Sequence, residues 1–200
     1  MTARIAILVE GATEAVLRLS LLRFLQRRLA GTMPKLDFMP QDGRLAKRDR
    51  LKRQVELLLR ANDAVVALTD VYTGTIPTDF VNAEDAKAKM RAWVGPEPRF
   101  HPHAAQYEFE AWLLPYWSTK IARSDQTAPA SNPESVNHQK PPSQCLNEVF
   151  RTGRHKRSYA KILDARKILD GQDLTVSAAI CPELKAFLNT ILTLSGGSPL

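Results

Sequence analysis

The chain alternates short, wholly apolar segments with longer segments in which apolar residues recur every three or four positions. The first apolar run covers residues 5–9 and leads directly into an amphipathic segment with helical spacing up to residue 29. A second run covers residues 64–69, and weaker runs cover residues 36–39 and 100–105. Continuous apolar runs separated by helical patterns are typical of strands buried on both faces of a parallel sheet. The pattern therefore predicts an α/β protein with a mainly parallel central sheet flanked by helices.

Helices are predicted between these strands and through the C-terminal part of the chain. Thr13 is expected to cap the first helix, because its hydroxyl can accept a hydrogen bond from a free N–H at a helix start. Asn82 is expected to do the same for a helix that runs to about Val94, where a Gly-Pro pair follows. Further helices are expected at residues 51–62, at residues 107–114 with Pro115 at the end, and in pieces that start near Ser158, Asp173 and Pro182.

Three parts are predicted along the chain. Residues 1–120 form the α/β core, residues 121–150 a surface loop or insertion, and residues 151–200 a helical part packed on the core. The stretch from Ser124 to Ser143 is rich in Pro, Ser, Asn and Gln and has no periodicity. Such composition is typical of a long surface loop or a partly disordered excursion.

Composition and charge favour a folded protein with an anionic partner. The 200 residues are 44% hydrophobic and carry a formal net charge of +7, which raises the local concentration of polyanions, so nucleic acid is the first candidate. Cys145 and Cys181 match neither a redox pair nor a zinc motif, and free buried thiols in a reducing compartment are expected. No segment approaches the roughly 18 apolar residues of a membrane span. We therefore expect a cytoplasmic protein.

Acidic residues follow the predicted strands. Glu10 comes directly after the first strand, Asp70 closes the second strong one, and Glu108 and Glu110 follow the last. Because parallel α/β sheets bind ligands at the carboxyl ends of their strands, these side chains are expected to converge. Glu14 and Glu108 would also suit solvated first-turn positions favoured by the helix dipole. The predicted Mg²⁺ (or Mn²⁺) ligands are Glu10, Glu14, Asp70 and Glu110.

A metal bound by these acids would reconcile them with a phosphodiester substrate, which bare carboxylates would repel. The ion could activate a water molecule and stabilise the leaving oxygen. Glu10 is the predicted general base or acid, and Asp70 the predicted principal metal ligand.

Two basic clusters could hold a polyanion. The cluster between Arg44 and Arg53 is interpreted as a solvated helix face, because nothing in the sequence links it to the acids. The later cluster includes Tyr159, which could stack on a base or donate a hydrogen bond. Its predicted nucleic-acid-binding residues are Arg154, Lys156, Arg157 and Lys161. His101 and His103 are interpreted as structural histidines, and Trp93, Trp112 and Trp117 as core side chains.

Several short motifs resemble one family. Leu-Val-Glu-Gly-Ala-Thr-Glu at residues 8–14 resembles the first motif of Toprim domains, and Leu-Thr-Asp-Val-Tyr-Thr-Gly at residues 68–74 resembles the second. With residues 101–103, 108–113 and 156–161, the pattern over residues 4–193 resembles a small bacterial Toprim-related family known as a domain of unknown function, DUF4276. The resemblance implies a compact α/β fold, Mg²⁺ dependence and nuclease activity like that of overcoming-lysogenization-defect proteins. It also implies an ATPase partner in phage defence.

One position departs from the Toprim pattern. Toprim domains commonly carry Asp-x-Asp at the second motif, whereas this chain has Tyr72 in place of the second Asp. A phenol binds Mg²⁺ poorly. The alternative function is therefore a non-catalytic adaptor that binds nucleic acid or an ATPase through a degenerate site, and the choice between DNA and RNA and the number of subunits, including a homo-oligomer, stay open.

Overall fold

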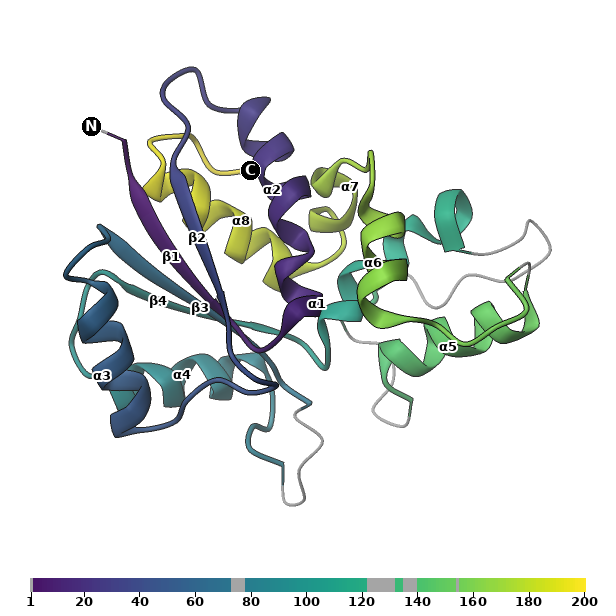
Figure 1. Ribbon diagram of the computed structural model, residues 1–200, viewed down its shortest axis with the longest axis horizontal. Coiled ribbons are helices and arrows are strands. Elements are labelled where there is room, and N and C mark those ends of the chain that lie inside the picture. The colour runs from purple at the N-terminus through teal and green to yellow at the C-terminus, as the bar shows by residue number, and fades with distance from the viewer. Residues whose placement is uncertain (1, 73–77, 122–131, 135–139, 154) are drawn as a thin grey trace.

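The centre of the molecule is a four-stranded, all-parallel sheet with the strand order β2-β1-β3-β4 (Figure 1). The computed structural model describes residues 2–72, 78–121, 132–134, 140–153 and 155–200. All four predicted strands are confirmed. They are β1 (Arg4–Val9), β2 (Lys35–Pro40), β3 (Ala64–Asp70) and β4 (Phe100–Ala105).

The two central strands are apolar throughout because helices cover both of their faces. Every residue of β3 is buried, and so is every residue of β1 except Arg4. Ile5 and Ile7 face one hydrophobic layer, whereas Ala6 and Leu8 between them face the other. The result is the predicted α/β protein with a parallel central sheet, and its arrangement is Rossmann-like.

Helices cover both faces of the sheet and form a hydrophobic layer with each face (Figure 1). Leu51, Val55 and Met90 join the first layer, and Leu21 and Phe187 join the second. The first layer consists of α3 (Asp49–Leu58) and α4 (Ala83–Val94), and the second of α2 (Leu17–Gln26), α7 (Leu174–Ala178) and α8 (Pro182–Leu194). The C-terminal segment therefore supplies part of the core.

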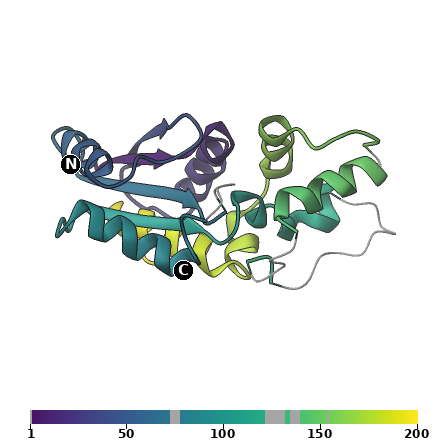
Figure 2. The same ribbon diagram turned by 90° about the horizontal axis from the view of Figure 1, so that it is seen from below.

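Further helices lie beyond the carboxyl ends of the strands, on the right in Figures 1 and 2. Phe109, Trp112 and Phe150 from this region join the larger hydrophobic cluster of the sheet. The elements are the 3₁₀ turns η1 (Phe109–Trp112) and η2 (Leu114–Tyr116), the π-helical turn η3 (Trp117–Ile121), α5 (Pro142–Thr152) and α6 (Lys161–Leu169).

Several local predictions need correction. The first helical turn, α1 (Ala12–Ala15), is capped by Gly11, and Thr13 lies inside it, because the Glu14 carboxylate already accepts the Gly11 N–H. The helix predicted at residues 107–114 is two 3₁₀ turns. Pro115 lies inside the second, where its missing N–H is tolerated in a first turn. Helix α5 was not predicted, since its first residues continue a Pro- and Ser-rich stretch.

Other local predictions are confirmed fully or in part. The Asn82 side chain accepts a hydrogen bond from the Asp85 N–H at 2.8 Å and caps α4. Trp112 and Trp117 are buried, whereas Trp93 is half-buried. Of the two free thiols, Cys181 is buried and Cys145 is half-buried. Most of the stretch from Ser124 to Ser143 lies outside the described residues. No helix in the described part of the chain is long and apolar enough to cross a membrane.

Candidate functional site

A pocket of about 320 Å³ opens where β1 and β3 end. The adjacent central strands deliver their following residues to the same edge of the sheet, so residues distant in sequence share one wall. The pocket walls hold four acids, a lysine and a phenol: Glu10, Glu14, Asp70, Glu108, Lys161 and Tyr72. Three of the four predicted metal ligands therefore line a single pocket.

Glu10 is held at this edge by its neighbours on β3. Its Oε1 accepts a hydrogen bond from the Thr69 hydroxyl and a longer one, at 3.3 Å, from the Asp70 N–H. The residue is 8% exposed. These bonds fix the position of the carboxylate before any ligand arrives.

Asp70 ends β3 and connects it to the segment after β4. Its Oδ1 accepts a hydrogen bond from the Phe109 N–H at 2.8 Å. The bond orders the turn that follows β4 and gives Asp70 a fixed orientation at the pocket.

Glu14 and Glu108 are buried, which excludes the solvated first-turn alternative for both. Glu14 Oε2 accepts the Gly11 N–H at 2.8 Å and is thereby folded back toward the strand end. Glu108 accepts two hydrogen bonds from Ser143, one from its N–H at 2.9 Å and one from its hydroxyl at 3.0 Å. Glu108 therefore joins the edge of the sheet to the start of α5.

Glu110 lies behind the pocket wall. It is 1% exposed, and its Oε1 has no hydrogen-bond partner among the described residues. Lys161 Nζ lies 3.4 Å from this oxygen, close enough for an ion pair although the geometry of a hydrogen bond is not met. Lys161, the first residue of α6, thus links the buried Glu110 to the pocket, and Glu110 is the one predicted metal ligand that does not line it.

The site disfavours full ionisation of its acids. Burial raises the pKa of Glu10 to about 7, and the negative charge of Glu14 adds to the effect. Burial also raises the pKa of Asp70, helped by Glu14 and Glu10, and raises the pKa of Glu110 to about 7 despite the nearby Lys161. Clustered buried carboxylates need a proton or a cation to balance their charge.

The donor set suits a hydrated cation more than a caged one. Among the described residues, no group of three or more His, Cys, Asp or Glu side chains is arranged to hold a metal ion. Mg²⁺ keeps several water ligands and is commonly held by one or two carboxylates, so it does not need such a group. Glu10 and Asp70, in a pocket with room for water, fit that requirement.

The predicted nucleic-acid-binding residues are dispersed. Lys161 lines the pocket, Lys156 is exposed ahead of α6, and Arg154 lies outside the described residues. Arg157 forms a bidentate ion pair with Asp164 at 2.6 and 2.5 Å. Its guanidinium also lies over the Phe150 ring, and Tyr159 packs edge-on against the same ring with centroids 5.4 Å apart. Arg157 and Tyr159 therefore have clear structural roles.

His103 has a structural role, as predicted. Its Nε2 lies 3.0 Å from the Thr190 hydroxyl, and its ring meets Phe187 edge-on, so it joins β4 to α8. Burial lowers the pKa of His103 to about 3 and keeps it neutral.

The sequence interpretation missed the loop after β2. The Gly43 N–H donates to the Glu10 carbonyl oxygen at 2.9 Å, which brings this loop over the pocket. Arg44 shares a narrow crevice with Glu10 and Thr69. Its positive charge partly opposes the effect of burial, which raises the pKa of Glu10. The view that nothing links the earlier basic cluster to the acids is therefore wrong for Arg44. The turn-forming residues before Gly43 predict a turn at this point of the sequence. The sequence does not reveal that the turn contacts Glu10, because that contact depends on which strands are neighbours.

Comparison with known proteins places the chain in a family without assigning an activity. No curated protein and no solved structure matches it. The profile of one family, described as Domain of unknown function (DUF4276), matches residues 9–192, a span that contains every acid of the pocket. The chain therefore belongs to the DUF4276 family of domains of unknown function.

Proposed function

We propose that this protein is a Mg²⁺-dependent phosphodiester hydrolase of Toprim type, a nuclease that works with an ATPase in phage defence. The observation that carries the proposal is the meeting of Glu10 and Asp70 in one pocket, from two adjacent parallel strands. The basic net charge of +7 supports nucleic acid as the substrate. The Toprim-like motifs at residues 8–14 and 68–74 contain these two acids.

In this proposal, Asp70 and Glu10 hold Mg²⁺ (or Mn²⁺), with Glu14 beside them. The bound ion would supply an activated water and charge stabilisation at the leaving oxygen. In the metal-free site, burial raises the pKa of Glu10 to about 7, so Glu10 is suited to take up or release a proton at neutral pH when Asp70 alone holds the ion. The Thr69 hydroxyl keeps the Glu10 carboxylate oriented, and Lys161 offers a positive charge to a phosphate oxygen.

The direct test is incubation of the purified chain with DNA and with RNA in the presence of Mg²⁺ or Mn²⁺. Cleavage by the wild type should fall about 100-fold or more in Glu10→Gln, which keeps the size of the side chain but cannot exchange a proton. Glu56→Gln, an exposed acid on α3, is the matched control and should cleave normally. Cleavage by Glu10→Gln at the wild-type rate would refute the assignment.

A second candidate, a non-catalytic adaptor, has its own support. Tyr72 lines the pocket, 48% exposed, where the Toprim pattern has a second acid. Calorimetry with Mg²⁺ and Mn²⁺ separates the two functions. The adaptor predicts no metal binding and no cleavage, together with co-purification of an ATPase, whereas the hydrolase predicts metal binding that Asp70→Asn removes.

A further inference from the structure

We infer that the arginines at the start of α3, together with Arg44 in the preceding loop, form the surface on which a nucleic acid strand lies as it enters the acid pocket. The surface comprises Arg44, Arg48, Arg50 and Arg53 and is called the arginine rim below. The identity of the polyanion rests on the proposed function. The location of the rim rests on the contacts of the loop and the helix.

The loop that carries Arg44 is held at the mouth of the pocket. The Gly43 N–H binds the Glu10 carbonyl oxygen, and Gly43 itself lines the pocket. Leu45 is buried in the core layer beneath α3, and Gln54 of α3 donates to the Gln41 side chain at 2.9 Å. The loop therefore keeps a fixed position at the pocket, and α3 is held against the loop.

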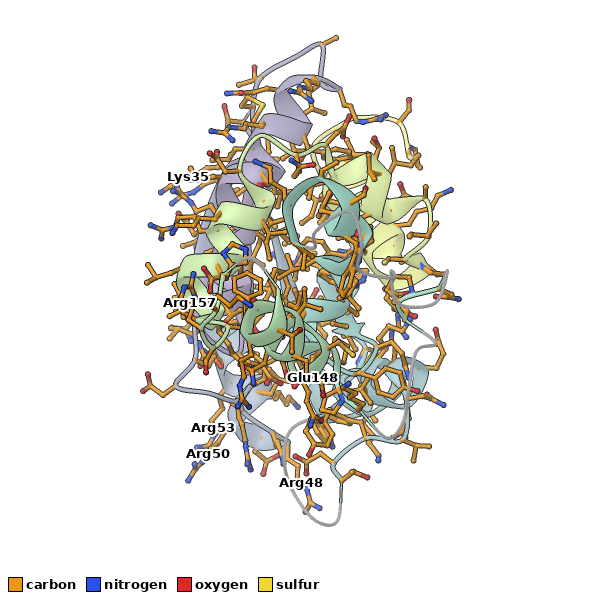
Figure 3. The ribbon with its side chains drawn as sticks, turned by 90° about the vertical axis from the view of Figure 1, so that its right-hand side faces the viewer. Lys35, Arg48, Arg50, Arg53, Glu148 and Arg157 are labelled. Carbon is orange, nitrogen blue, oxygen red and sulfur yellow. The ribbon has the colours of Figure 1, made fainter. Side chains whose placement is uncertain are left out.

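The rim arginines are exposed and available. Arg50 and Arg53 are three positions apart, so they share one side of α3, while Leu51 is fully buried in the core beneath the helix. Figure 3 shows Arg48, Arg50 and Arg53 projecting outward in the same part of the surface. Within the described residues, no ion pair involves any of these three arginines. Lys47 differs from them, because its ammonium binds Asp79 at 2.6 Å.

Exposed arginines on a loop and helix that adjoin an acid pocket suit a polymer of phosphates. An isolated phosphate would need one cationic site, and the acids next to it would oppose its binding. A strand can instead place several phosphates along the rim while a neighbouring phosphodiester reaches the pocket, where a cation or Lys161 offsets the acids. The charges of the rim and of the pocket are then complementary parts of one site.

The later basic segment offers fewer available charges. The Arg157 guanidinium is occupied by Asp164, and Lys161 lies in the acid pocket itself, where its charge offsets the acids and does not flank them. Among the described residues, the arginine rim is therefore the better source of the flanking contacts.

The test measures binding apart from cleavage. The full chain is titrated in EDTA, which stops metal-dependent hydrolysis, against fluorescently labelled DNA and RNA oligonucleotides, and fluorescence anisotropy gives Kd at several salt concentrations. The triple variant R48E/R50E/R53E should weaken binding by about 10-fold or more at low salt. The slope of log Kd against the logarithm of the salt concentration should also be smaller by about two to three, as expected when three phosphate contacts are lost.

The matched control is R60E/R91E/K185E, which reverses three exposed charges elsewhere and changes the net charge equally. It should change Kd by no more than about 2-fold. The neutral variant R48Q/R50Q/R53Q, checked for folding by circular dichroism, should fall between wild type and the Glu variant. Equal weakening by rim and control variants, or no weakening by the rim variants, would overturn the inference. If the rim variants weaken binding but the wild type cleaves neither DNA nor RNA, the inference about the rim stands and the proposed hydrolase activity is refuted.

Discussion

The Asp70 N–H donates a hydrogen bond to the Glu10 carboxylate at 3.3 Å, although 60 positions separate the two residues. The contact exists because β1 and β3 are adjacent and parallel, so their ends coincide. It forces two acidic residues into one buried environment. The negative charge of Glu10 then adds to the effect of burial in raising the pKa of Asp70.

Replacement of Glu10 by Gln should stabilise the metal-free protein at alkaline pH. Burial raises the pKa of Glu10 from 4.5 to about 7, so the folded state holds a proton that the unfolded state releases. The stabilisation from this proton is present below pH 4.5 and is lost as pH rises through about 7. The shift corresponds to about 3 kcal/mol at most. Urea denaturation in EDTA should show Glu10→Gln more stable by about 1 to 3 kcal/mol at pH 8, with the gain shrinking toward pH 5.

Glu97→Gln is the control for this measurement. The pKa of Glu97 is lowered by its hydrogen bonds from Arg99, so its replacement should give no gain at pH 8. A Glu10→Gln gain that is equal at pH 5 and pH 8 would contradict the assignment of the raised pKa.

Replacement of His103 by Gln should flatten the acid side of the stability curve. Burial lowers the pKa of His103 to about 3, so the unfolded state takes up a proton that the folded state excludes. The contribution of the neutral His103 ring to the free energy of unfolding is fully present above pH 6.5. It is lost as the pH falls toward 3, at about 1.4 kcal/mol per pH unit. Urea denaturation between pH 4 and 7 should show a shallower slope for His103→Gln, whose amide can still reach Thr190. His101→Gln, on the same strand but half-buried, should change the slope less, and equal slopes for wild type and His103→Gln would exclude a buried neutral His103.

Removal of the Glu134 carboxylate should destabilise the start of α8. Glu134 accepts the Trp112 indole N–H at 2.7 Å, the Glu183 N–H at 2.9 Å and the Leu184 N–H at 3.3 Å, so one buried side chain satisfies three donors. Glu134→Ala removes the acceptor of all three donors and should lower the free energy of unfolding by about 2 kcal/mol. Glu134→Gln should recover part of the loss, because its oxygen still accepts. The control, Glu148→Ala, breaks an exposed ion pair with Lys140 and should lower the free energy of unfolding by less than about 0.5 kcal/mol. An equal loss for both Ala variants would contradict the stabilisation of α8 by Glu134.

Replacement of Lys161 by Met should raise the pKa of Glu110 further above its value of about 7. The Lys161 charge opposes the effect of burial on Glu110, and Met retains much of the side-chain volume. NMR titration of the Glu110 side-chain carboxyl carbon measures the shift. Lys167→Met, on the same helix, should leave the midpoint unchanged. An unchanged Glu110 midpoint in Lys161→Met would mean that the ion pair does not form in solution.

The strands and their terminal acids were predictable because their signals are local. Residues 64–69 form an uninterrupted apolar run, and such a run ending in Asp70 has few alternatives to a buried strand end. The same reasoning applies to Glu10. The pairing of the two acids required only that both strands be central and parallel, which their apolar character already indicated.

The burial of Glu14 and Glu108 was not predictable from local pattern. An acid in a first helical turn has the same sequence signature whether it is solvated or folded inward. The inward position of Glu108 depends on Ser143, 35 residues later, and such a partner leaves no local trace. The prediction that Pro115 ends a helix failed for a related reason, because a first-turn proline and a helix-ending proline differ only in what precedes them.

The sequence by itself determined the α/β class, the order of the strands along the chain and the acids that terminate β1 and β3, since apolar periodicity and its interruption are properties of short segments. Only the tertiary structure decided that β2 lies next to β1, that Gly43 and Arg44 therefore reach Glu10, and that Lys161 approaches Glu110 from α6. These contacts depend on which strands are neighbours and on how distant helices pack. Both are settled by burial of the whole core and not by any one segment.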